Sequence, residues 1–196
     1  AYEISACLVG SEMCIRDRYR LFGKILLKIL HKKKLKVLDI IFKKNKKLNI
    51  RLKNKILAQL RIAIGRVAPE ITWYENGKQL RLSSLKDGLN YLLIFYSTGC
   101  SHCLREVPEI YEYMEGKTNT KVIAFAMETS DDVWSNYQLK MPGWHHVLGL
   151  GKWENPTART YQINSTPSYF VLGMDKQIIS IPETIDDLKF VIRELN

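Results

Sequence analysis

Two cysteines separated by two residues, Cys100 and Cys103, are the side chains of this chain best suited to chemistry. They lie in YSTGCSHCLREVP, residues 96–108, after an apolar run and before a stretch of helical character. At the start of a helix, free backbone N–H groups and the helix dipole stabilise an anion such as a thiolate. We therefore expect Cys100, the more N-terminal and exposed thiol, to attack a disulfide, and Cys103, one turn inward, to resolve the mixed disulfide.

Metal binding and simple packing are the alternatives for this pair. A structural zinc site needs four ligands, and the only other cysteines are Cys7 and Cys14, in a segment that we interpret as non-native. A c-type haem attachment requires His directly after the second cysteine, where this chain has Leu104. A buried structural thiol seldom occupies a strand-to-helix turn at this spacing. Redox chemistry is the favoured interpretation, and we expect no metal and no bound cofactor.

Two titratable side chains accompany the cysteines. His102 lies between them, where a cation or N–H donor would stabilise the Cys100 thiolate and make the site more oxidising. Alternatively, His102 is a solvated helix residue with little effect on the Cys100 thiolate. Glu106 could take the proton that leaves Cys103 during exchange. Its alternative is an exposed glutamate in the first turns of the helix.

The elements that must position these residues follow an α/β pattern. The apolar runs 91–97 and 121–127 are typical of central strands buried on both faces, and residues 101–115 have helical character. Asn76-Gly77 predicts the turn of a hairpin, and a brief helical or turn segment is expected to begin at Leu85. The other expected elements are a helix with Ser130 as its N-cap, a strand over 145–150, a helix with Pro156 at its first position, strands over 167–174 and 177–181, and a C-terminal helix capped by Thr184 and Asp187.

The charge of the chain is concentrated in its first third. Residues 20–66 hold 16 Lys and Arg against Asp39 alone, whereas residues 67–196 hold 12 Lys and Arg against 16 Asp and Glu. Apolar residues at helical spacing within residues 20–64 predict one or two basic helices. Their apolar face must pack against a domain, a partner or a lipid surface, so we expect a linker from an upstream domain or contact with an anionic membrane surface. Without a reader motif or interleaved aromatics, nucleic acid is not an expected partner.

The first residues differ from the rest of the chain. Residues 1–19 match neither neighbouring segment in composition, and they resemble a translated sequencing-adapter remnant. We therefore predict three parts: residues 1–19, a non-native or disordered segment; residues 20–64, the basic helical extension; and residues 65–196, the α/β domain. No secretory signal can be read in the sequence.

Residues from about 65 to 196 resemble a thioredoxin-like domain, in particular the extracytoplasmic thiol-disulfide oxidoreductases of the TlpA-like group, which includes cytochrome c maturation reductases. FYSTGCSHC stands where that family has its strand and CXXC, although Thr98-Gly99 replaces the common aromatic beside the first cysteine. Glu106 stands where these reductases often carry an acidic residue, and Pro108 where a proline kinks the active-site helix. Thr166-Pro167 matches the cis-proline loop opposite the dithiol. A trans proline that starts an edge strand is the alternative.

The resemblance implies a thioredoxin-like fold, a central mixed sheet flanked by helices. It also implies a redox-active Cys100–Cys103 disulfide in place of a cofactor, and Thr166 backbone groups that pair with a substrate strand. The partners would be protein thiols or disulfides and an upstream thiol electron donor. Reduction is the implied direction, against the oxidising influence expected of His102, and the bacterial cell envelope, most of all the periplasm, is the implied location. The alternative function is a redox-inert interaction domain with a basic docking helix.

Overall fold

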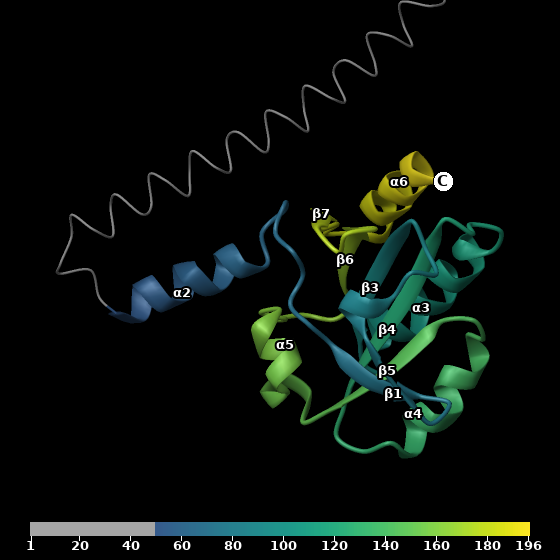
Figure 1. The fold of residues 1–196 in the computed structure, drawn as a ribbon. Helices are drawn as coiled ribbons and strands as arrows, with labels where there is room; N and C mark the ends of the chain where they lie inside the picture. The colour runs from purple at the N-terminus through teal and green to yellow at the C-terminus, as the bar shows by residue number, and fades with distance from the viewer. Residues whose placement is uncertain (1–49) are drawn as a thin grey trace, which may run out of the picture. The chain divides into compact units, whose positions relative to one another are not determined.

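A computed structural model describes residues 50–196 (Figure 1). The predictions for residues 1–49, which include the non-native segment, Cys7 and Cys14 and most of the basic extension, lie outside the described residues. The chain divides into two units, and the second, Asn54–Asn196, contains the sheet. Helix α2 (Ile50–Arg61) is the first described element. Among residues 50–196, no helix has both the length and the apolar character needed to cross a membrane. The predicted domain boundaries stay predictions.

A five-stranded mixed sheet forms the centre of the second unit. Its strands are β3 (Asn90–Tyr96), β4 (Thr120–Glu128), β5 (His145–Leu150), β6 (Ser168–Gly173) and β7 (Ile178–Ser180). The order across the sheet is β5-β4-β3-β6-β7, in which β3, β4 and β5 are parallel to one another. β6 runs antiparallel to β3, and β7 antiparallel to β6. The predicted strands are therefore confirmed, with ends that differ by a few residues.

One face of this sheet is covered by three helices (Figure 1). They are α3 (Ser101–Met114), α4 (Asp132–Tyr137) and α6 (Ile185–Leu195). Successive residues of a strand point to opposite faces, so Leu92, Ile94 and Tyr96 of β3 pack on this side with Cys103 of α3. The inner cysteine is thus part of the core that holds α3 on the sheet.

The opposite face is covered by a hairpin and a short helix. The hairpin consists of β1 (Thr72–Glu75) and β2 (Lys78–Arg81), and the helix is α5 (Pro156–Thr160). Phe95 lies on this side, with its ring centroid 5.0 Å from those of Phe125 and Tyr161. The predicted hairpin turn is confirmed, because Asn76 and Gly77 have φ angles of 50° and 73°, as a tight two-residue turn requires.

The short helical segment after the hairpin lies earlier than predicted. A 3₁₀ turn spans Leu82–Ser84, and Leu85, the expected first helical residue, is already extended beyond it. Leu82 is buried and its N–H donates to the Ile71 carbonyl, so the turn forms directly where β2 ends. Leu85 instead places its side chain in the core.

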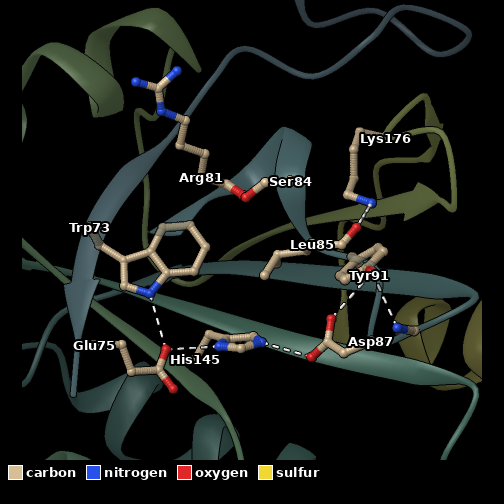
Figure 2. Close-up of polar contacts among 10 residues, drawn as sticks. Trp73, Glu75, Arg81, Ser84, Leu85, Asp87, Tyr91, His145 and Lys176 are labelled. Carbon is tan, nitrogen blue, oxygen red and sulfur yellow. Dashed lines mark hydrogen bonds and ion pairs between the residues drawn. The ribbon is translucent and has the colours of Figure 1, made fainter. Parts of the chain in front are cut away.

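His145 at the start of β5 fastens the hairpin to the sheet (Figure 2). Its Nδ1 lies 2.8 Å from Glu75 Oε2 and its Nε2 lies 2.9 Å from Asp87 Oδ2, while Trp73 Nε1–H donates to Glu75. Burial raises the pKa of both carboxyl groups, but the hydrogen bonds with His145 and the smaller interactions outweigh it, and both pKa values lie below their ordinary range. A single imidazole thus joins β1, β5 and the loop before β3.

The helix starts confirm two predictions, Pro156 at the first position of a helix and the Thr184–Asp187 cap, and correct a third. Asn155 caps α5, which has Pro156 at its first position, and Thr184 and Asp187 form a reciprocal capping box at α6. Ser130 was expected to cap α4, but the residue at that position is Asp131. The Asp131 backbone is already in the helical region and its carbonyl accepts the Ser135 N–H, so Ser130 lies one residue too early to act as the cap.

Candidate active site

The two cysteines lie where β3 ends and α3 begins, at the carboxyl end of a central strand. Cys100 is the N-cap residue of α3, and its Sγ accepts the Cys103 N–H at 3.3 Å. Both thiols are free. Cys100 is half-buried and Cys103 is fully buried in the core beneath α3. One sulfur is therefore partly accessible to solvent, and the other lies behind it within the same helical turn.

The environments of the two thiols move their pKa values apart. Partial burial raises the pKa of the Cys100 thiol, but hydrogen bonds with the side chains of Cys103 and Thr166 and with the Cys103 and His102 backbone outweigh it, so the pKa lies below its ordinary value. Burial, together with the hydrogen bond to Cys100, raises the pKa of Cys103 to about 12. Cys100 therefore forms a thiolate more readily than Cys103 does.

Alkylation of the reduced protein is expected to distinguish the two thiols. Iodoacetamide should modify Cys100 with a pH midpoint below the reference thiol value of 9.0, because its pKa is lowered. Cys103 should stay unmodified at pH 8, where roughly one molecule in 10⁴ would carry its thiolate, and the sulfur is buried besides. Mass spectrometry of tryptic peptides at successive pH values measures both rates. Equal labelling of the two cysteines in the folded protein would contradict the expectation.

The Thr166-Pro167 loop lies against Cys100. The peptide bond between these residues is cis, so the alternative of a trans proline does not hold. The Cys100 S–H donates to the Thr166 carbonyl at 3.2 Å, across 66 residues of sequence. β6 begins directly afterwards, at Ser168. The structure therefore brings together the residues that the sequence singled out for the dithiol and for the substrate backbone.

His102 is exposed, and its imidazole lies beside Arg105. The distance from His102 Nδ1 to Arg105 Nη2 is 3.0 Å. The contribution of His102 to the lowered pKa of Cys100 comes through its backbone N–H. Sequence reasoning expected the imidazole to act on the thiolate and did not single out Arg105. The i, i+3 spacing of the two residues on α3 is the pattern that could have indicated this contact.

Glu106 is directed toward the sheet rather than fully into solvent. The Tyr169 O–H donates to Glu106 Oε2 at 2.7 Å, and Arg105 Nη2 lies 3.7 Å from Oε1. Only 19% of the Glu106 side chain is exposed, so its alternative as an exposed glutamate does not hold. Tyr169 is buried in β6, two residues after Pro167. Nothing in the motif singled out this tyrosine, although the alternation of β6 places it on the α3 side of the sheet.

Glu128 is a buried carboxylate that the sequence did not indicate. It ends β4, and its Oε1 accepts the Thr98 N–H at 2.5 Å while Oε2 accepts the Ser97 O–H at 3.4 Å. The Gly99 N–H in turn donates to Ser97 Oγ at 3.2 Å. Glu128 therefore holds the loop that leads into Cys100, at the place where an aromatic side chain is common in the resembled family.

Metal ligands do not gather around these thiols. Within residues 50–196, no group of three or more His, Cys, Asp and Glu side chains is arranged to hold a metal ion. The Cys103 N–H and the Thr166 carbonyl both contact the Cys100 sulfur. The arrangement can stabilise a thiolate at Cys100 and hold a second thiol close behind it.

Comparison with known proteins gives structural matches only. No protein-family model matches the chain, and no curated protein matches its sequence. The thioredoxin domain of a thiol-disulfide oxidoreductase from Bacteroides vulgatus is similar, with 23% identity over 68% of this chain and 99% of that one, and a TM-score of 0.59. A domain of a "possible thiol-disulfide isomerase" from Cytophaga hutchinsonii has 25% identity over 67% and 92% of the two chains, with a TM-score of 0.58.

A third similar structure is a thiol:disulfide interchange protein from a Bacteroides species. Its identity to this chain is 22%, over 68% of this chain and 90% of that one, with a TM-score of 0.56. In each case the match spans nearly the whole neighbouring domain and about two thirds of this chain. These similarities confirm the predicted fold class: this chain has the thioredoxin-like fold.

Proposed function

We propose that this protein is a thiol-disulfide oxidoreductase that reduces disulfides of protein partners through Cys100 and Cys103. The observation that carries the proposal is the pairing of a half-exposed Cys100, with a lowered pKa at a helix N-terminus, with a buried Cys103 whose pKa is raised to about 12. The names of the neighbouring structures from Bacteroides and Cytophaga support the same class of enzyme.

Each residue has a definite role in the exchange. The Cys100 thiolate attacks a substrate disulfide, and one substrate sulfur leaves as a thiolate. Thr166 and Pro167 orient the substrate backbone beside Cys100, since the Thr166 carbonyl already lies 3.2 Å from its sulfur. Cys103 then attacks the Cys100 sulfur, releases the second substrate thiol and closes the Cys100–Cys103 disulfide. Glu106 takes the proton of Cys103, and His102 tunes the thiolate through its backbone N–H.

The remaining requirements follow from this chemistry. The redox-active disulfide serves in place of a cofactor, and a reduced thiol protein upstream must return the two electrons. The resemblance to the TlpA-like group supports reduction as the direction and the bacterial cell envelope, in particular the periplasm, as the location. The charge of residues 20–64 supports contact with an anionic membrane surface.

The reduction potential of the Cys100–Cys103 pair tests the proposal. The protein is equilibrated with glutathione or dithiothreitol buffers, and the fraction of disulfide is measured by trapping the free thiols. A potential near the roughly −270 mV of thioredoxin would support a reductase, whereas one near the roughly −120 mV of DsbA would overturn the proposed direction. A pair that forms no disulfide at any buffer ratio would overturn the redox function and favour the interaction domain.

A further inference from the structure

Three tyrosines, Tyr96, Tyr137 and Tyr169, pack in the same core cluster as Cys103. The charge of Cys103 raises the pKa of Tyr96, Tyr137 and Tyr169, although burial of each phenol is the larger cause. Within the part of the chain that the structure describes, the hydroxyl groups of Tyr96 and Tyr137 have no hydrogen-bond partner. The Tyr169 hydroxyl differs from both, because it donates to the Glu106 carboxylate at 2.7 Å. Tyr169 thus packs in the same core cluster as Cys103 and donates to the Glu106 carboxylate of α3.

Resolution of a mixed disulfide requires Cys103 to lose its proton in a place that solvent does not reach. The Cys103 side chain is fully buried and its pKa is raised to about 12, so roughly one molecule in 10⁵ carries the thiolate at pH 7. Glu106 follows three residues later on the same helix, and residues at this spacing are neighbours on one face. A carboxylate held at that place would provide a base within the site.

The Glu106 carboxylate, however, is also attracted away from the sheet by a neighbouring charge. Glu106 lies in the second turn of α3 beside Arg105, whose guanidinium is 3.7 Å from Oε1 and is itself largely exposed. An arginine at the surface would draw the carboxylate outward. Tyr169 acts in the opposite direction, because it is buried and anchored in β6, where it pairs with Ile94 of β3. Its hydrogen bond holds Oε2 against Tyr169, which packs in the same core cluster as Cys103.

We propose that Tyr169 is a positioning residue, which holds the Glu106 carboxylate where it can take the proton of Cys103 in the resolving step. The inference rests on the proposed function and names a residue for one step of it. The Cys103 thiol gives its proton to Glu106, and the Cys103 thiolate bonds to the Cys100 sulfur. The bond between Cys100 and the substrate breaks, and the substrate sulfur leaves with the electron pair and takes up a proton. The substrate disulfide is reduced by two electrons, and the Cys100–Cys103 pair is oxidised by two.

The test measures the resolving step by itself in the full-length protein. Reduced protein is mixed with glutathione disulfide, the reaction is quenched with acid at successive times, and mass spectrometry follows the Cys100–glutathione mixed disulfide. Tyr169→Phe removes only the hydroxyl and keeps the ring in the core. The matched control is Tyr113→Phe, because the Tyr113 hydroxyl also donates a hydrogen bond, to the Lys189 carbonyl at 2.8 Å, at the far end of α3.

Tyr169→Phe is expected to slow decay of the mixed disulfide about tenfold at pH 7, a part of what a general base contributes. The difference in decay rate between Tyr169→Phe and the wild-type protein should shrink as pH rises, since hydroxide then replaces Glu106 as the base. Glu106→Gln should slow decay further, and Tyr169→Phe should add nothing in that background, because the two residues act as one unit. Alkylation of Cys100 should be unchanged in both single variants, which separates the effect from a general disturbance of the site.

The possible results separate a failure of the proposed function from a failure of the inference alone. If the wild-type protein forms no Cys100–Cys103 disulfide with glutathione disulfide, the proposed function fails and the inference with it. If the wild-type protein resolves the mixed disulfide and Tyr169→Phe matches Tyr113→Phe at every pH, the inference alone is overturned. A Tyr169→Phe effect that is independent of pH, or that persists in full in the Glu106→Gln background, would also overturn it.

Discussion

Replacing Cys100 with serine is expected to lower the reduction of a protein disulfide at least about a thousandfold, because a serine hydroxyl cannot act as the attacking thiolate. Cys103→Ser is expected to leave the attack intact and to trap a mixed disulfide between Cys100 and the substrate, since the resolving sulfur is missing. Turnover is measured by reduction of a disulfide-bonded substrate protein with dithiothreitol as electron donor, and the trapped complex by non-reducing gel electrophoresis.

The controls for this pair are the other two cysteines of the chain. Cys7 and Cys14 lie outside the described residues, and the Cys7→Ser and Cys14→Ser variants are expected to leave turnover unchanged. Unfolding by urea, followed for all four variants, establishes that the thioredoxin-like domain remains folded. Substantial turnover in the Cys100→Ser variant, or no trapped complex in the Cys103→Ser variant, would refute the assignment of the two roles.

Replacing Gly149 with alanine is expected to destabilise the protein by about 1–3 kcal/mol, the usual cost of overpacking a core. Gly149 lies in β5, and an added Cβ would come 2.2 Å from Cε1 and 2.4 Å from Cζ of Phe125. The Phe125 ring cannot move aside freely, because it is buried and packs against Phe95 at 5.0 Å between ring centroids. Denaturant unfolding of the reduced protein gives the free-energy difference.

The matched control for this substitution is Gly99→Ala. A Cβ at Gly99 would meet only Ser97 Oγ, at 3.7 Å, an ordinary van der Waals contact, and the backbone there is not in the left-handed region. This variant should unfold close to the wild-type midpoint. Equal stability of Gly149→Ala and Gly99→Ala would contradict the close approach of the Phe125 ring to Gly149 in β5.

Much of the fold was predictable from short stretches of sequence. The continuous apolar run of β3 indicated a strand buried on both faces, and Asn76-Gly77 indicated a hairpin turn, because only such residues adopt its φ angles readily. The capping box of α6 was readable from Thr184 and Asp187, since both partners lie within one helical turn. The errors at Ser130 and Leu85 concern element ends, which depend on how the adjoining chain packs.

The candidate site divides in the same way. The sequence by itself placed Cys100 at the start of α3 and Cys103 in the first turn of that helix, because the position of a residue relative to the adjoining strand and helix is a local property. Only the tertiary structure decided what surrounds them. Glu106 meets Tyr169 across 63 residues, and Glu128 meets Thr98 across 30. Such pairs leave no periodicity or spacing in the sequence, because they form only when β3, β4 and β6 lie side by side and α3 packs on one face of the sheet.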